Sequence, residues 1–435
     1  MDAGRNFKTT GSSEIGTNNQ IYLSANGLID LYSARVLSVY GVNLFANDSI
    51  KLYFSTLNAI GANASISLKT ANESGGNNYG LSIDTSWVDY TGGLNLTSGK
   101  NINLIDLNLN KTEKIDPKNI NIYTGGSFSW DGKSKAQKKI NGDLNIQAKD
   151  QIELKNLNTI TTTGDLKLNG KNLNIGNDLV SEKNVSLTAA QGDLSLNKNI
   201  TAQTNIDIVS LDGKLNLTAV KATSSQGKLS ILGAKDTILT NFGTIQTTLN
   251  GYQGVNVGTI GQGNLALQNT VLESQNGNIV VTSEGQNTLT DSAITAKGNI
   301  ELFAKDNLTL DGIKSSSQQH TALNSKKNIY INSQAGTGDS VNFSSTKTTE
   351  LNSTGTLSLI SDKNQNLQNT KLTGGAVLLE AGGALNTPKA IEFNATGSDL
   401  LKNDSKLISL NGDLSIQTKE SLTIDPNIHT LKAVG

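Results

Sequence analysis

A short phrase recurs along this sequence and limits the folds that the chain can adopt. The phrase consists of Gly or Asn, one polar residue, and two apolar residues that a polar residue separates. Its copies begin at Gly142, Gly164, Gly192, Gly213 and Gly412, and, where Asn leads, at Asn184, Asn205, Asn307 and Asn328. Because apolar and polar residues alternate, the phrase has the period of a β-strand and not that of a helix. Each copy therefore indicates a turn followed by a strand.

The phrases recur at a nearly fixed spacing. Leu144 and Leu166 lie 22 positions apart, and Val185 and Ile206 lie 21 apart. A fixed period of this size indicates one supersecondary unit that stacks on copies of itself. Two phrases usually fall within one period, so each coil carries at least two strands, and each strand pairs with its equivalent one coil along. The sequence predicts an all-β, right-handed parallel β-helix, a solenoid of about 21-residue coils, whose hand follows from the crossover rule.

The composition agrees with a solenoid and separates it from disorder. The chain has 43 Gly, 3 Pro and no Cys, and Asn, Thr and Ser fill most polar positions. Such residues suit tight turns, because they accept positive φ or hydrogen-bond the backbone. Disordered chains combine low hydrophobicity with high net charge. Here the hydrophobic fraction is a low 35%, but the net charge is only −1, and the regular apolar spacing favours a folded chain.

Several functional classes find no support in the sequence. The near-zero net charge argues against nucleic acid, whose binding needs a basic stripe. No stretch has the roughly 18 apolar residues of a transmembrane helix, and the start lacks the apolar run of a signal peptide. Acidic residues such as Asp143 and Asp165 sit singly in turns, and the two histidines, His320 and His429, lie far apart. We therefore predict no catalytic, cofactor-binding or metal-binding residues, and no enzyme.

The glycine-led coils resemble the filamentous-haemagglutinin repeats of two-partner-secreted bacterial proteins, which include large adhesins and the contact-dependent growth inhibition effectors of the CdiA type. The resemblance extends from Gln20 to Ile424 and rests on the coil phrase. It implies a secreted filament at the bacterial cell surface, exported through an outer-membrane transporter by parts outside this chain. In the inhibition effectors, a central region binds a target-cell receptor. Nothing in the chain resembles the secretion domain or the toxin domain of that family, so we expect a piece of a longer protein.

Aromatic residues are concentrated before residue 140. This region holds seven of nine Tyr, both Trp and four of eight Phe. Tyr and Trp are enriched at the hot spots of protein interfaces. We therefore divide the chain into residues 1–140, aromatic-richer β-helix coils with two loop insertions and the candidate receptor-binding part, and residues 141–435, which hold regular filamentous-haemagglutinin-type repeats.

Two stretches of residues 1–140 interrupt the phrase and carry aromatic residues. The first lies between Asn72 and Gly93, and the second between Lys111 and Lys139. Insertions in a solenoid map to its outside, where an aromatic patch indicates binding. Two interpretations stay open: the rings form an exposed patch, or they fold back over the edges of the coils. The candidate receptor-binding residues are Tyr79, Trp87, Tyr90, Tyr123, Phe128 and Trp130.

Other side chains are assigned to structural positions. Tyr22, Phe45 and Phe54 lie in strand phrases, which favours places that fill or cap the first coils. The segment from Gln334 to Glu350 is poor in aromatic residues and is interpreted as a long coil corner. A solvated loop is expected for the lysines of the second insertion, which are Lys133, Lys135, Lys138 and Lys139.

The sequence thus predicts a non-enzymatic filament segment that binds a target-cell surface receptor, either a protein or a glycan. The alternative is a purely structural stalk, or a general adhesin, without a defined receptor.

Overall fold

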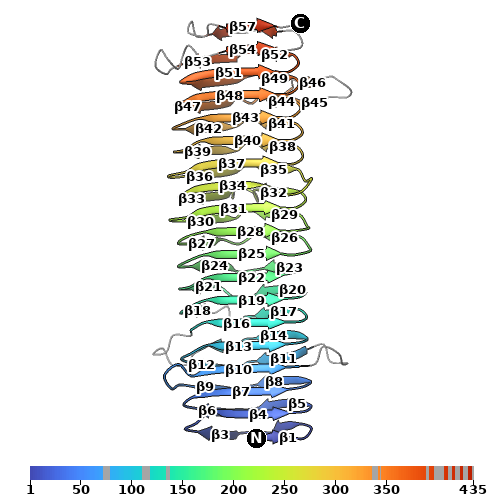
Figure 1. Ribbon diagram of the computed structural model, residues 1–435, viewed down its shortest axis with the longest axis vertical. Helices are drawn as coiled ribbons and strands as arrows, with labels where there is room; N and C mark the ends of the chain where they lie inside the picture. Colours follow the sequence, from blue (N-terminus) through green and yellow to red (C-terminus); the bar gives the residue numbers. More distant parts are fainter. Residues whose placement is uncertain are drawn as a thin grey trace. The chain divides into compact units, whose positions relative to one another are not determined.

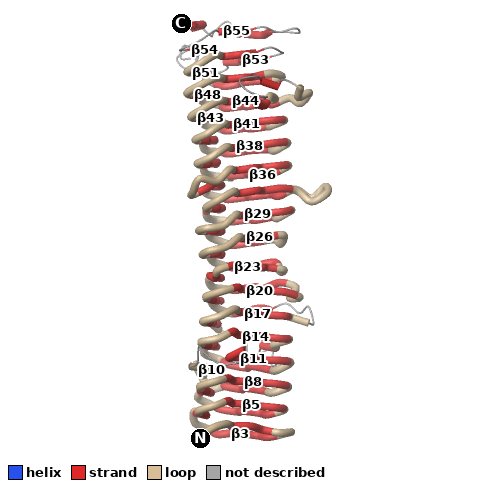
Figure 2. The backbone as a smooth tube through the Cα atoms, turned by 90° about the vertical axis from the view of Figure 1, so that its right-hand side faces the viewer, coloured by secondary structure: helices blue, strands red, loops and turns tan. Residues whose placement is uncertain are grey.

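The chain forms two compact units, Met1–Ile208 and Val209–Gly435. The computed structural model describes residues 1–71, 79–109, 118–133, 138–335, 341–342, 344–387, 391–395, 406–409, 414–416, 422–424 and 430–433. The regular elements within these ranges are β-strands, and Figure 2 draws them with loops and without a helix. Accordingly, the described residues include no helix that is long and apolar enough to cross a membrane. Both units are all-β, as the repeat predicts.

In the first unit a typical coil carries three strands, and strands of successive coils pair in parallel, which Figure 1 shows as a stack in chain order. The first face consists of β1 (Asp2–Ala3), β4 (Ile21–Ala25), β7 (Gly41–Ala46), β10 (Ser65–Thr70), β13 (Leu94–Ser98), β16 (Ile120–Thr124), β19 (Leu144–Ala148), β22 (Leu166–Gly170) and β25 (Val185–Ala189). The second face consists of β2 (Phe7–Thr9), β5 (Leu28–Tyr32), β8 (Ser49–Tyr53), β11 (Tyr79–Asp84), β14 (Asn101–Ile105), β17 (Phe128–Asp131), β20 (Gln151–Lys155), β23 (Asn172–Ile175) and β26 (Leu194–Leu196). The third face holds two sheets, one of β3 (Ser13–Thr17), β6 (Ala34–Ser38), β9 (Thr56–Ala59), β12 (Trp87–Tyr90) and β15 (Asn108–Leu109), the other beginning with β18 (Lys138–Ile140), β21 (Thr159–Thr162), β24 (Asp178–Ser181) and β27 (Ile200–Ala202).

The second unit repeats this plan, and β28 (Ile206–Ser210) spans the division between the units. Its first face consists of β31 (Lys228–Gly233), β34 (Gly254–Thr259), β37 (Asn278–Ser283), β40 (Ile300–Ala304), β43 (Thr321–Ser325), β48 (Thr356–Ser361), β51 (Ala376–Ala381), β54 (Lys406–Ser409) and β57 (Thr430–Ala433). Its second face consists of β29 (Leu215–Thr218), β32 (Thr237–Thr240), β35 (Leu265–Gln268), β38 (Asn287–Thr290), β41 (Leu308–Asp311), β44 (Ile329–Ile331), β49 (Gln365–Leu367), β52 (Leu385–Thr387) and β55 (Leu414–Ile416). Its third face consists of β30 (Lys221–Ser224), β33 (Thr247–Gly251), β36 (Thr270–Ser274), β39 (Ala293–Ala296), β42 (Lys314–Ser317), β47 (Thr349–Ser353), β50 (Thr370–Gly374), β53 (Ile391–Ala395) and β56 (Leu422–Ile424).

The apolar residues of the phrase form columns inside the coils. In the first unit Leu144 pairs with Leu166, and Leu166 pairs with Val185. All three side chains are fully buried, whereas the intervening Asn145 and Lys167 are exposed. Coils lie about 22 residues apart. The parallel β-solenoid is therefore confirmed, and its right-handed sense stays a prediction.

Asn or Asp in the turn just before the first apolar residue of a phrase joins one coil to the next. The carboxylate of Asp143 accepts the backbone N–H of Asp165 at 2.8 Å, and the side-chain oxygen of Asn184 accepts the backbone N–H of Asn205 at 3.1 Å. Between these pairs, the side-chain amide of Asn184 donates to the carboxylate of Asp165 at 2.9 Å. Turn backbone groups need such partners. Asn and Asp are thus structural at this position.

A second constraint acts at the corner that follows the second-face strands. One residue at this corner adopts a left-handed backbone conformation in many coils, and Gly312 (φ 68°) takes the same place in one of them. Asn, Asp and Gly adopt this conformation at lower cost than other residues. The non-glycine residues with positive φ here include Ser33, Phe54, Thr85, Asp106, Asn156, Ala219, Asn269, Asp291, Asn332 and Asn369.

Lys138 occupies an inward position where the third face changes from one sheet to the other. It pairs with Ile160, is 5% exposed, and donates from its ammonium to the carbonyl oxygen of Leu107 at 2.8 Å. The predicted solvated loop is therefore wrong for Lys138, whereas Lys135 lies outside the described residues. Burial lowers the pKa of Lys138, and the charge of Asp106 partly opposes that effect.

Replacing Lys138 by Met is expected to stabilise the first unit, because an apolar side chain of similar length does not carry the desolvation penalty of a buried ammonium. The pKa of Lys138 is lower in the folded state, so the unfolded state binds more protons. The stability of the unsubstituted protein should therefore rise with pH from that lowered pKa towards about 10.4, the value of an unfolded Lys. We expect a gain of about 1 kcal/mol or more at pH 7 for Lys138→Met, and a weaker pH dependence, in urea unfolding followed by circular dichroism.

The matched control is Lys139→Met, because Lys139 is the exposed neighbour on the same strand. Its substitution should leave the free energy of unfolding within about 0.5 kcal/mol. Equal effects of the two substitutions would contradict the inward position of Lys138.

Candidate binding surface

Three of the six predicted receptor contacts lie in the core. Tyr90, Phe128 and Trp130 are 0% exposed. The segments that carry them are strands β12 and β17, which continue the coils, and Trp130 takes an inward position between Leu104 and Leu154. Of the two interpretations left open, the exposed patch is therefore wrong for these three rings, which lie inside the coils. Burial also raises the pKa of Tyr90 far above its ordinary range.

The other three predicted residues do not form one patch. Trp87 is partly exposed on β12 of the third face, whereas Tyr123 is 54% exposed on β16 of the first face. The side chain of Tyr79 lies outside the described residues. The structure thus places Trp87 and Tyr123 on different sheets, and their role in binding stays a prediction.

Aromatic residues that the sequence assigned to the interior point outward instead. Tyr22 is 60% exposed and lies between the buried Ile21 and Leu23 on β4. Phe45 and Phe54 are also exposed. In a strand that is buried on one face only, the residue between two inward residues points to solvent. Tyr22 and Phe45 do lie in strands, β4 and β7, whereas Phe54 lies at the corner that follows β8. The expected interior position is wrong for all three rings.

Three exposed rings gather at one corner of the first unit. Tyr32 on β5 pairs with Tyr53 on β8, and their rings stack with centroids 5.5 Å apart and planes at 23°. The ring of Phe54 meets Tyr53 edge-on at 4.3 Å and Tyr32 at 6.4 Å. All three remain between 39% and 49% exposed. Such rings offer rigid contact area with few rotatable bonds, which is typical of protein-binding hot spots. We call them the aromatic corner.

Phe54 is strained at this corner. Its φ is 52°, and many equivalent corners carry Asn or Asp, which accept positive φ more readily. A bulky residue in this conformation is an outlier that costs about 1–3 kcal/mol. Packing against Tyr32 and Tyr53 leaves nearly half of the ring in water, so burial offsets little of that strain. Strain of this kind clusters at functional sites, which makes Phe54 the central residue of the candidate surface.

The second face continues from the aromatic corner into a polar surface. The strand register aligns Tyr53 with Asp84 and then with Ile105. Ile105 lies two strand spacings, about 10 Å, from Tyr53. It borders a shallow hollow of 310 Å³, whose walls include Asn103, Ser129, Asp131, Glu153 and Lys155. The ammonium of Lys155 pairs with Glu153 at 2.9 Å. The first unit thus presents rings beside amide, hydroxyl and charged groups on one face.

Sequence reasoning missed this surface, although the sequence carries part of the signal. The segment Gly126-Ser127-Phe128-Ser129-Trp130 has the pattern of the phrase with aromatic rings in place of Leu or Ile. Reading it as a strand would have placed Phe128 and Trp130 inside, and the same alternation would have placed Tyr22 outside. The aromatic corner needs the coil register as well, because Tyr32 and Tyr53 are 21 positions apart.

Part of the chain matches a known protein family. Residues 274–346 match the family model described as hemagglutinin repeat. The matched segment lies in the second unit and covers a minority of the chain. None of the curated proteins or the solved structures gives a significant match. The family match supports a filamentous-haemagglutinin-like repeat in that segment, and it does not separate CdiA-type effectors from other proteins that carry such repeats.

The predicted boundary at residue 140 describes composition. The first-face ladder continues through it, because β16 pairs with β19 from Ile120↔Leu144 to Thr124↔Ala148. The compact units divide after Ile208, and the functional division into residues 1–140 and 141–435 stays a prediction. The aromatic corner lies within residues 1–140, although none of its three rings is among the predicted receptor contacts, whereas the neighbouring hollow extends to Glu153 and Lys155.

Proposed function

We propose that this chain is a segment of a cell-surface filament of a two-partner-secreted bacterial exoprotein, and that its first unit binds a receptor on a target cell. Contact-dependent growth inhibition by CdiA-type effectors is the biological setting that we favour. Export through an outer-membrane transporter would be the task of other parts of that protein. The chain would act by binding and without catalysis.

The aromatic corner carries the proposal. A stalk needs inward columns and soluble outer faces, and it gains nothing from the strained and exposed Phe54. A receptor-binding surface does gain from three rigid rings held side by side, because truncating such a residue at an interface often weakens binding by 2 kcal/mol or more. The parallel β-solenoid and the hemagglutinin-repeat match support the filament part of the proposal.

The substitution Phe54→Asn tests the proposal with a residue that other coils use at the same corner, for example Asn156. We expect binding of the purified chain to receptor-bearing cells to weaken about 30-fold, which corresponds to about 2 kcal/mol. The thermal midpoint should stay constant or rise, because Asn relieves the strained conformation. Flow cytometry with labelled protein measures binding, and circular dichroism measures the midpoint. Tyr53→Ser should weaken binding in the same way.

The control is Phe242→Ala in the second unit, because Phe242 is a more exposed ring, at 72%, outside the aromatic corner. Its substitution should leave binding unchanged. Normal binding by both Phe54→Asn and Tyr53→Ser would remove the aromatic corner from the proposal. Failure of the unsubstituted chain to bind any candidate target cell would favour the structural stalk.

A further inference from the structure

Between β44 and β47 of the second unit, the described residues 333–335, 341–342 and 344–348 form an insertion whose strands belong to no face of the solenoid. The described part of it contains a short antiparallel pair, β45 (Gln334–Ala335) with β46 (Val341–Asn342). It was interpreted as a long coil corner, but it also lies against second-face strands. The carbonyl oxygen of Ser345 accepts the side-chain amides of Gln368 and Asn369, each at 3.3 Å. The insertion is therefore attached to the coil that follows it.

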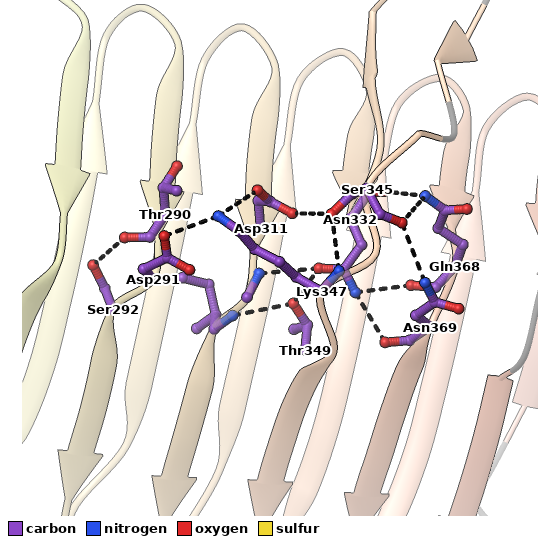
Figure 3. A network of polar contacts seen from close by, with 12 residues as sticks. Thr290, Asp291, Ser292, Asp311, Asn332, Ser345, Lys347, Thr349, Gln368 and Asn369 are labelled. Atoms are coloured by element: carbon purple, nitrogen blue, oxygen red, sulfur yellow. Dashed lines mark hydrogen bonds and ion pairs between the residues drawn. The ribbon is translucent and has the colours of Figure 1, made fainter.

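An ion-pair network attaches the insertion to the preceding coils as well. Figure 3 shows Lys347 reaching between two corner carboxylates, with its ammonium 2.8 Å from Asp291 and 3.0 Å from Asp311. The hydroxyl of Ser345 donates to Asp311 at 2.6 Å. Hydrogen bonding to Asp291 is the main cause that raises the pKa of Lys347, so its ammonium stays charged at physiological pH. These contacts join residues up to 56 positions apart and hold Ser345 and Lys347 against the two preceding coils.

The described residues of the insertion border a half-open hollow of 360 Å³ against the second face. One wall consists of outward residues of β38 and β41, including Thr288, Thr290 and Thr309, which lie side by side through the strand register. The insertion supplies the opposite wall, which includes Asn342 and Ser344. The volume lies within the range of small-molecule sites.

The chemistry of the walls selects a ligand class. Hydroxyl and amide groups dominate, and the one carboxylate, of Asp311, is paired with the one ammonium, of Lys347. An anion finds no unpaired cation in this lining, and a metal ion would have to displace Lys347. An apolar peptide side chain would find no apolar wall. Hydroxyl groups both donate and accept, so their best partner is a neutral molecule that carries several hydroxyl groups of its own.

We propose that the hollow between the second face and the insertion, lined by Thr288, Thr290, Thr309, Asn342 and Ser344, is a binding site for a neutral saccharide. The site lies in a different unit from the aromatic corner and does not depend on it. Ser345 and Lys347, which also line the hollow, are held against the second face by their hydrogen bonds and ion pairs, which reduces the ordering cost of binding there.

The test uses the whole chain and an immobilised panel of neutral oligosaccharides, with sialylated and sulfated oligosaccharides for comparison. We expect binding to at least one neutral oligosaccharide and no preference for charged ones. The double substitution Thr290→Val and Thr309→Val removes two wall hydroxyls and keeps side chains that strands favour. It should weaken that binding at least tenfold. Thr218→Val, on the same face but outside the hollow, should leave it unchanged.

Each outcome decides the inference. Absence of binding to every neutral oligosaccharide would overturn the site, and a preference for the charged ones would overturn the ligand class. Unchanged binding by the double Val variant would place the saccharide elsewhere. Circular dichroism of that variant must match the unsubstituted chain, and Phe54→Asn must retain saccharide binding. Loss of saccharide binding in Phe54→Asn would assign the saccharide to the aromatic corner and would overturn the hollow.

Discussion

Replacing Leu194 by Asp is expected to destabilise the first unit by about 3–5 kcal/mol, whereas Ser195→Asp on the same strand should change stability by less than about 0.5 kcal/mol. Leu194 is fully buried and pairs with Leu173. The carboxylate of an Asp at this position would therefore lie inside a dry column without a partner. Ser195 is exposed one position later. The two substitutions add the same charge one residue apart and differ only in the direction of the side chain.

Amide hydrogen exchange is the suitable measurement for this pair. Solenoids open locally, because each coil contacts only its neighbours, so a global midpoint would understate the effect. Leu194→Asp should speed exchange in β23 and β26, and Ser195→Asp should not. Equal tolerance of both substitutions would mean that the inward register of β26 is wrong.

The strand alternation could be predicted from the sequence because burial enforces it in most coils, although some inward positions of the second unit, such as Thr237 and Thr321, carry buried polar residues. Leu144, Leu166 and Val185 must all be apolar, since a polar residue at any of them would enter the same dry column. The constraint repeats in most coils, so it leaves a periodic signal. The link between Asp143 and the backbone of Asp165 adds a second periodic constraint, which is why Gly, Asn and Asp recur in the phrase.

The candidate surface could not be predicted in the same way, because nothing periodic constrains an outward position. Tyr53 aligns with Asp84 and Ile105 on neighbouring coils, and these three residues share no property. Only the strain at Phe54 singles out the aromatic corner, and φ is not visible in the sequence. The ion pair between Lys347 and Asp291 could not be predicted from the sequence either, because the stacking of coils brings together residues that are 56 positions apart.

The aromatic corner and the buried rings of β17 also differ in what their loss should do. Removing an exposed ring changes binding and leaves the core intact, whereas removing a buried ring leaves a cavity. Trp130 was predicted as a receptor contact, and the structure makes it a core residue. Substitution of Trp130 is therefore expected to lower stability, and not to remove a contact with the receptor.

Trp130→Ala is therefore expected to destabilise the coils around β17 by about 3–5 kcal/mol, as truncation of a buried Trp does. The ring lies between Leu104 and Leu154, and these side chains cannot fill the space that it leaves. Exchange should accelerate in β14, β17 and β20. Trp130→Phe should recover most of the stability, because it restores much of the volume and removes an indole N–H that is buried without a hydrogen-bond partner.

Cell binding by Trp130→Ala separates the core role from a contact role. At a temperature where circular dichroism shows the variant still folded, it should bind target cells as the unsubstituted chain does, whereas Phe54→Asn should not. A Trp130→Ala variant that keeps normal exchange in β14, β17 and β20 but loses cell binding would show that the ring is a surface contact. Because Trp130→Ala should lower stability without weakening binding, and Phe54→Asn should weaken binding without lowering stability, no general loss of folding can imitate the expected pair of results.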